Sequence, residues 1–283
     1  MSAGTVALLG ADLAVGNTIL PPLAPLGAGL SLLTAADGNV VVADAPDGLL
    51  LVNGGGRGDA VTIVSMLRAQ FGGRPVLTLI NTDWHPAHHG LNEPMRKAGA
   101  AVLAHEYTKQ YLQRAGVKAG LPTKTFYTTD TLTFGGDTVE CGHLGQAHTD
   151  GDIYVRFKQK TVLVAGDMLT VGKYPIADVQ SGGWLGGMVT ATKTLLDLTN
   201  EQTKVIPGLG PVQTRAALDA QHKMLSAVRE RFVKMMRQGM SADDMLAGGI
   251  TKDFDATWGD PKEFIRTAYK GMWLHVRELG GII

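Results

Sequence analysis

A group of imidazole and carboxylate side chains that follows a short apolar stretch constrains the fold of this chain more than any other feature. Residues 76–80 are apolar apart from one threonine, which predicts a buried strand. Asp83, His85, His88 and His89 come soon after it. Side chains two positions apart on an extended segment point to the same side, so we expect Asp83 and His85 to face one point in space. Such a convergence is typical of a divalent metal site.

Three later segments also place polar groups where predicted strands end. His148 lies in a turn between two β-type stretches, within the sequence Ala-His-Thr-Asp-Gly-Asp. The apolar residues 162–165 precede Gly166 and Asp167, which puts a carboxylate at another strand end. Residues 205–211 form a fourth junction, between an apolar stretch and a loop rich in glycine and proline. These junctions supply the ligands that a histidine pair alone would lack.

The order and content of the four junctions resemble the metallo-β-lactamase-fold hydrolases over about residues 38–211. The pattern of that family is Asn-Thr-His-x-His-x-Asp-His, then Ala-His-Thr-x-Gly-Asp, then Gly-Asp, then Pro-Gly-His-Gly-Pro. The resemblance implies a four-layer αββα sandwich formed by residues 1–212. It also implies a hydrolase in which a metal ion activates water for attack on a carbonyl group.

The sequence departs from the family pattern at three ligand positions. Asp83 stands where the family has its first histidine, Ala87 where it has the aspartate, and Leu209 where it has the last histidine. Side chains of alanine and leucine have no lone pair to give to a metal. The positions that match the pattern are His85, His88, His148 and Asp167.

These departures favour one metal ion over two. Of the residues that hold the second ion in the family, only His88 and Asp167 remain. The first position keeps Asp83, His85 and His148, and two imidazoles with one carboxylate are the ligand set of several catalytic zinc sites. We therefore predict one zinc ion at these three residues. Asp167 is expected to be its fourth ligand or the proton acceptor for its bound water.

Several features of the predicted site have alternatives. Two histidines and a carboxylate are also the ligands of non-haem iron enzymes, so iron and manganese are alternatives to zinc. The catalytic base would be Asp167 or His88, because Ala87 cannot accept a proton. Without a second ion to stabilise the leaving group, the preferred substrates would be esters, lactones or thioesters. A non-hydrolytic metal enzyme (a lyase or an iron oxidoreductase) and a metal-free binding protein on the same fold remain as other functional classes.

Some polar residues of these segments also have purely structural interpretations. His88 and His89 can line the start of the following helix instead of binding metal. His143 lies on the strand before His148 and is expected to pack rather than to coordinate. Asp152 is expected to bond to the backbone of its own turn.

A glycine-rich segment follows Asp167 and is expected to pass the metal site. Tyr174 and Trp184 in this segment are predicted to wall a substrate pocket. The alternative is that the glycines of this segment only permit tight packing.

From residue 213 the pattern becomes wholly helical, which predicts a C-terminal helical extension over residues 213–283 that packs on the main domain. Residues 217–238 indicate one long helix, and Ser241 and Asp260 each begin a predicted capping box. The last helix is expected to carry a broad apolar stripe. Such a stripe packs in a core, covers the substrate mouth or forms the interface of a homodimer. Its members are Ile265, Ala268, Tyr269, Met272, Trp273, Val276 and Leu279.

Composition argues against nucleic acid and membranes as partners, and a small-molecule substrate is the expected partner. The chain has 26 basic and 26 acidic residues and no basic cluster, which argues against binding to nucleic acid. A single cysteine, Cys141, excludes an internal disulfide. Polar residues and prolines interrupt the N-terminal apolar stretches, so neither a leader nor a membrane-spanning helix is recognised. A membrane partner is not expected, and a cytoplasmic location is slightly favoured.

Overall fold

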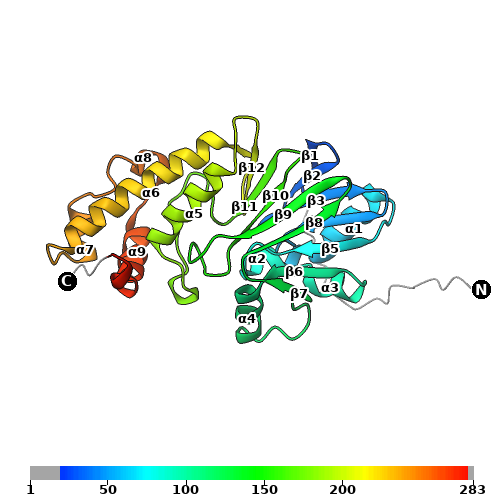
Figure 1. Cartoon of the computed structure of the whole chain (residues 1–283), viewed down its shortest axis with the longest axis horizontal. Helices are drawn as coiled ribbons and strands as arrows, with labels where there is room; N and C mark the ends of the chain where they lie inside the picture. The colour runs from blue at the N-terminus through cyan, green and yellow to red at the C-terminus, as the bar shows by residue number, and fades with distance from the viewer. Residues whose placement is uncertain (1–19, 280–283) are drawn as a thin grey trace, which may run out of the picture.

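Two β-sheets packed face to face form the centre of the molecule, and helices cover the outer face of each sheet (Figure 1). The computed structural model describes residues 20–279. The prediction that residues 1–19 contain no leader therefore falls outside the described part of the chain. The layers confirm the αββα sandwich and the C-terminal helices that the sequence predicted.

The first sheet starts as an antiparallel meander and continues with parallel strands. Its first four strands pair antiparallel. The remaining three strands pair parallel. In sheet order, the strands are β1 (Ala24–Gly27), β2 (Leu30–Thr34), β3 (Asn39–Ala45), β4 (Gly48–Val52), β5 (Val76–Ile80), β6 (Ala101–His105) and β7 (Lys124–Phe126).

The apolar sequence of β3 follows from its position between two covered faces. Val41 and Ala43 belong to the core between the sheets. Val40 and Val42 point to the opposite side and pack under the helices. A strand buried on both faces is apolar at almost every position, whereas a half-buried strand alternates with polar residues.

Helices that connect the strands cover the first sheet. Ile63, Leu67 and Phe71 lie on one side of a helix at a spacing of four residues and pack on the sheet. Asp59, just before this helix, ends a short 3-10 turn, and its side chain makes no capping hydrogen bond. The helical segments are η1 (Arg57–Asp59), α1 (Ala60–Phe71), α2 (Pro86–His89), α3 (Asn92–Lys97) and α4 (Glu106–Arg114).

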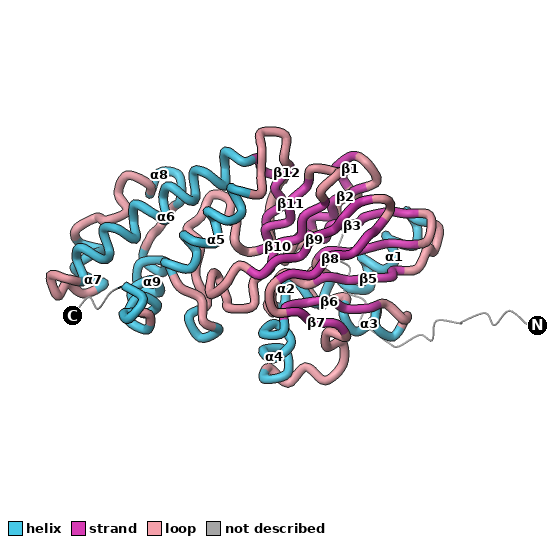
Figure 2. Tube along the Cα trace, in the orientation of Figure 1, coloured by secondary structure: helices cyan, strands magenta, loops and turns pink. Residues whose placement is uncertain are grey.

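The second sheet has the strand order β13-β12-β11-β10-β9-β8 (Figure 2). Neighbouring strands pair antiparallel except for the parallel pair β11 and β12. Side chains of alternate residues, such as Val155, Phe157 and Val164, fill the space between the two sheets. The strands are β8 (Thr129–Phe134), β9 (Asp137–His143), β10 (Ile153–Phe157), β11 (Val162–Gly166), β12 (Lys204–Pro207) and β13 (Gln213–Thr214).

Two long helices and the C-terminal segments cover the second sheet. Leu163 of β11, Leu195 and Phe232 belong to one continuous core that joins the sheet to these helices. Within residues 20–279, no helix is both long enough and apolar enough to cross a membrane. The helical segments are η2 (Val179–Ser181), α5 (Leu185–Asp197), α6 (Arg215–Met236), α7 (Ala242–Ala247), α8 (Asp255–Trp258), α9 (Lys262–Leu274) and η3 (Val276–Leu279).

The C-terminal helices match the sequence predictions in part. Ser241 and Asp244 form the predicted capping box of α7. The second predicted box is absent, because Pro261 takes the capping position of α9 and Asp260 accepts a hydrogen bond from the backbone of Lys262. The apolar stripe is shorter than expected, since α9 ends at Leu274. The buried residues of this stripe pack in the core. The division of the chain at residue 212 remains a prediction, and so does the formation of a homodimer.

Several strand ends and loops meet at one edge of the sandwich. The backbone NH and side-chain amide of Asn39, at the start of β3, donate hydrogen bonds to the carbonyl groups of Gly208, Pro207 and Gly210. Ile153, at the start of β10, donates a backbone hydrogen bond to Thr82. These bonds join the two sheets at the edge where β5, β11 and β12 end.

Candidate metal centre

Asp83 and His85 lie on a bent segment that follows β5. Oδ1 of Asp83 accepts a hydrogen bond of 2.8 Å from the backbone NH of His85 and lies 3.3 Å from its ring Nδ1. The two side chains converge as predicted, although residues 82–85 form bends rather than a continuation of the strand. Asn53 helps to hold this segment, since its side-chain oxygen accepts hydrogen bonds from the backbone and hydroxyl of Thr82.

His148 lies on the loop between β9 and β10, which Asp152 holds in shape. The carboxylate of Asp152 accepts hydrogen bonds from the backbone NH groups of His148 and Thr149 at 2.6 and 2.8 Å. It also accepts one from the Thr149 hydroxyl at 2.6 Å. This arrangement agrees with the structural role expected for Asp152. Its Oδ1 lies 3.5 Å from Nδ1 of His148, so it also faces the imidazole ring.

Asp167 follows the end of β11, where two glycines give its side chain room. Gly166 has a φ of 57°, in the left-handed region that favours glycine, and a β-carbon there would press on the side chain of Thr82. A β-carbon on Gly208 would overlap the carboxylate of Asp167 itself. The Gly-Asp and Pro-Gly pairs at these junctions therefore fit a close approach of the two strand ends.

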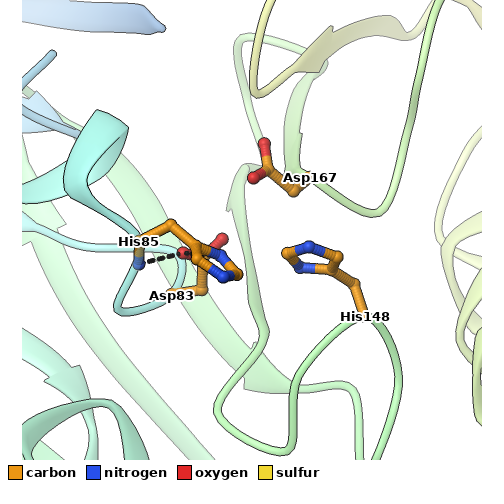
Figure 3. Close-up of side chains that lie close together, drawn as sticks. All are labelled: Asp83, His85, His148 and Asp167. Atoms are coloured by element: carbon orange, nitrogen blue, oxygen red, sulfur yellow. Dashed lines mark hydrogen bonds and ion pairs between the residues drawn. The ribbon is translucent and has the colours of Figure 1, made fainter. Parts of the chain in front are cut away.

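The side chains of Asp83, His85, His148 and Asp167 point towards one centre (Figure 3). One nitrogen or oxygen atom from each residue lies within 4.8 Å of those of the other three. The rings of His85 and His148 have centroids 4.9 Å apart. Three separate loops bring these four residues together, which is the convergence that the sequence predicted.

His88 lies behind this group and touches both of its carboxylates. Its Nε2 is 3.3 Å from Oδ2 of Asp83 and 3.1 Å from Oδ2 of Asp167. Its side chain is 0% exposed, whereas that of Asp167 is 30% exposed. His88 is thus beside the centre but does not face solvent, and it lies near the end of α2 rather than at its start.

Opposite charges perturb every titratable group of the centre. Burial lowers the pKa of His85, but Asp178 and Asp83 outweigh it and raise this pKa to about 10. Burial also lowers the pKa values of His88 and His148, but nearby carboxylates outweigh burial and raise both values to about 9. Burial is the strongest single influence on Asp83 and Asp167 and would raise their pKa values, but the neighbouring histidines, His88 first among them, together outweigh it and lower both.

This set of groups fits a divalent cation. The two carboxylates lie close together in a buried site, where the charge of Asp167 acts to raise the pKa of Asp83. Nδ1 of His85 is buried and makes no hydrogen bond to any residue of the described chain. Buried polar atoms without partners are rare in folded proteins. Two imidazoles and two carboxylates around one point are ligands that zinc, iron and manganese accept.

Comparison with known proteins identifies the family of this fold. The sequence profile described as the metallo-beta-lactamase superfamily matches residues 33–232. The chain belongs to the metallo-beta-lactamase superfamily. No curated protein matches the sequence at a significant level.

Solved structures of superfamily members share the architecture at low sequence identity. A metallo-beta-lactamase from Pontibacter korlensis is 20% identical with a TM-score of 0.65, and the match covers 74% of this chain and 99% of the other. The DIM-1 metallo-beta-lactamase is 18% identical with a TM-score of 0.61 and the same coverage. Sequence identity of 18–20% shows that the fold is shared. The substituted site residues distinguish this chain from the ligand pattern of the superfamily.

Two of the three substituted positions, Ala87 and Leu209, contribute no ligand. Ala87 is half-buried in α2, and Leu209 is 42% exposed on the loop after β12. Neither side chain has a nitrogen, oxygen or sulfur atom. The second metal position of the superfamily pattern therefore keeps only His88 and Asp167 from its protein ligands.

The other two histidines of the predicted segments lie outside the group of four. His143 stacks on His105 with ring centroids 3.8 Å apart, and its Nε2 contacts the backbone oxygen of Asp150 at 2.8 Å. This contact agrees with the packing role expected for His143. His89 is the last residue of α2 and is not part of the potential metal-binding group.

The structure places the two predicted substrate-binding aromatic residues in the core. Tyr174 is 4% exposed, and its hydroxyl donates a hydrogen bond of 2.8 Å to Asp255. Trp184 is 8% exposed and stacks on His275 at 4.4 Å. Their burial does not fit a pocket wall. It corresponds to the alternative of tight packing, because a β-carbon on Gly186 would overlap the Trp184 ring.

Asp178 contacts the centre although no sequence pattern predicts a role for it. Its Oδ2 lies 3.4 Å from Nε2 of His85. Burial would raise the pKa of Asp178, but the contacts with His85 and Ser181 lower it to about 2. Position 178 lies in a loop without regular spacing, so the only available signal was its place in the segment that follows Asp167.

Proposed function

We propose that this chain is a metal-dependent hydrolase that acts on an ester, lactone or thioester of a small molecule and uses a single metal ion. The observation that carries the proposal is the convergence of Asp83, His85, His148 and Asp167 on one centre. Ala87 and Leu209 at the second position of the pattern support one ion rather than two. Zinc is the first choice, because the ligand set and the superfamily both favour it.

Asp83, His85 and His148 would hold the ion. A divalent ion at such a centre supplies Lewis acidity, which polarises a carbonyl group and makes water more acidic. Oδ1 of Asp83 accepts a hydrogen bond from the backbone of His85 and Oδ2 faces Nε2 of His88, so each oxygen keeps a further lone pair for the centre. Three protein ligands leave a position open for substrate, as in other catalytic zinc sites.

Asp167 is the residue that we assign as proton acceptor. It faces the same centre as the three ligands, and its side chain remains 30% exposed. A lowered pKa keeps its carboxylate ionised at neutral pH, so an unprotonated oxygen faces water at the centre, although the same shift makes that oxygen a weak base. Because Ala87 cannot perform this role, Asp167 is the carboxylate left to do so.

His88 supports the carboxylates rather than meeting the substrate. Its Nε2 lies between Asp83 and Asp167 at 3.3 and 3.1 Å, and its side chain is 0% exposed. From this position it holds the orientation of both carboxylates. Of the two bases suggested by the sequence, we therefore retain Asp167 and assign His88 as a positioning residue.

The proposed substrate class follows from a centre that has protein ligands for a single ion. Two-metal sites stabilise both the attacking and the leaving atoms of a displacement. A centre with one ion has less help for a poor leaving group such as an amine. Alkoxide and thiolate groups leave more easily, which favours esters, lactones and thioesters.

A substrate panel with metal analysis tests the proposal. Purified protein, loaded with zinc, iron or manganese in turn, is assayed on aryl esters, lactones and acyl thioesters, with the His148→Ala variant and chelator-treated protein as controls. We expect about one zinc ion per chain and hydrolysis of at least one class, lost in both controls. Failure on the whole panel with full metal occupancy contradicts the proposal. If the protein binds iron in preference to zinc, a non-hydrolytic metal enzyme is favoured instead. If it binds no metal, a metal-free binding protein is favoured.

A further inference from the structure

The two ring nitrogens of His85 face different carboxylates. Nδ1 lies 3.3 Å from Oδ1 of Asp83, on the side of the metal centre. Nε2 lies 3.4 Å from Oδ2 of Asp178, on the opposite side of the ring. Nδ1 is buried and lacks a hydrogen bond within residues 20–279, which leaves it available for a metal. The ring orientation therefore depends on what holds Nε2.

Asp178 is itself held in a single position. Its Oδ1 accepts hydrogen bonds from the backbone NH groups of Gln180 and Ser181 at 3.1 and 3.3 Å. Its Oδ2, the atom that faces His85, also accepts a hydrogen bond of 2.6 Å from the Ser181 hydroxyl. These bonds fix the carboxylate before any ligand binds, so it can restrict the imidazole at little further cost in entropy.

The backbone of Asp178 is joined to the loop that carries His148. Its NH donates a hydrogen bond of 2.7 Å to the carbonyl oxygen of His148. Its own carbonyl oxygen accepts one of 2.9 Å from Gly183, at which a β-carbon would overlap the His148 backbone. Asp178 thus contacts His85 through its side chain and His148 through its main chain.

We propose that Asp178 is a positioning residue of the metal centre, which orients His85 through Nε2 and couples it to the loop of His148. The inference rests on the proposed use of His85 and His148 as metal ligands. A carboxylate that accepts the free NH of a ligating histidine fixes its tautomer and strengthens it as a donor. Asp178 would provide this function from a segment that supplies no ligand.

Metal affinity of two variants tests the inference independently of hydrolysis. Asp178→Asn keeps a side chain of the same size but loses the negative charge that faces Nε2. Ser181→Ala is the matched control, because it removes the Ser181 bond to the same oxygen and leaves the contact with His85. We expect Asp178→Asn to weaken zinc binding by about 10- to 100-fold in a chelator competition assay. Ser181→Ala should change affinity less than about threefold, and cobalt(II) spectra should change only in Asp178→Asn.

The outcomes separate this inference from the proposed function. Unchanged zinc affinity in Asp178→Asn, or an equal loss in Ser181→Ala, overturns the inference. If Asp178→Asn does not fold, long-range proton–nitrogen NMR spectra of the zinc-loaded wild type replace it. A protonated Nε2 of His85 is then expected, and a zinc-bound Nε2 overturns the inference. If Asp178→Asn binds zinc more weakly as expected but the wild type hydrolyses no substrate, only the proposed function is contradicted. A wild type that binds no zinc contradicts both the proposed function and this inference.

Discussion

The α-carbon of Gly208 lies so close to the Asp167 carboxylate that a β-carbon at this position would overlap Oδ1. The contact arises because β11 and β12 are parallel neighbours and end together, with a hydrogen bond of 2.7 Å from the Gly208 NH to the Gly166 oxygen. The glycine of one junction thereby determines where the carboxylate of another can point.

Gly208→Ala should displace the Asp167 side chain. The added methyl group cannot fit beside Oδ1, so we expect hydrolytic turnover to fall at least about tenfold, as for other misplaced catalytic groups. Gly58→Ala is the control, because a β-carbon at Gly58 meets nothing within 4 Å. Steady-state kinetics on a substrate from the panel measure the effect. Equal kinetics in both variants would show that the position of Asp167 is not critical.

Asp167→Asn distinguishes a proton acceptor from a metal ligand. Asparagine retains the shape of the side chain but cannot take up a proton from water. We expect kcat to fall by about 10²- to 10⁴-fold while zinc affinity changes by less than about tenfold. Both quantities are measured on the same sample, by steady-state kinetics and chelator competition. Parallel losses of zinc and activity would instead identify Asp167 as mainly a ligand.

Ala87→Asp combined with Leu209→His should restore the second metal position. Both native side chains are partly or largely exposed, so the changes do not disturb the core. We expect zinc content to rise from about one to about two ions per chain, because four protein ligands would then surround the second position. Elemental analysis of the wild type, both single variants and the double variant gives the answer. Two ions already in the wild type would contradict the proposed single site.

Phe232→Ala tests whether α6 belongs to the main core. Phe232 is fully buried with Leu163 of β11 and Leu195 of α5. Its removal should lower the free energy of unfolding by about 3–5 kcal/mol. Leu274→Ala, at a side chain that is 71% exposed, should change it by less than about 0.5 kcal/mol. Chemical denaturation should show one transition, and a separate transition of the C-terminal helices would support an independent unit after residue 212.

His105 should make the protein less stable in mild acid. Burial and then the charge of His143 lower the pKa of His105 from 6.5 to about 4. The unfolded chain therefore binds more protons between pH 6.5 and 4, so stability is lost as the pH falls through this window. The loss is at most about 3 kcal/mol. Denaturation of the metal-free wild type and His105→Gln across this range measures it, and identical pH profiles would exclude a role for His105.

The sequence allowed most of the fold to be predicted because local patterns carry that information. The apolar stretches at residues 76–80 and 162–165, which became β5 and β11, are recognised from their composition alone. The capping box predicted at Asp260 is absent, because Pro261 takes the capping position of α9. Local propensity does not report such competition.

The residue types alone indicate which donor groups are present: Asp83, His85, His148 and Asp167 as potential ligands, with Ala87 and Leu209 unable to coordinate. The orientation of these groups depends on the folded arrangement of the loops. The contact of Asp178 with His85, the burial of His88 behind two carboxylates and the packing of Trp184 on His275 all join segments distant in the chain. The physical reason is that residue types determine which bonds a group can form, whereas the packing of loops from both sheets determines which partners lie within reach.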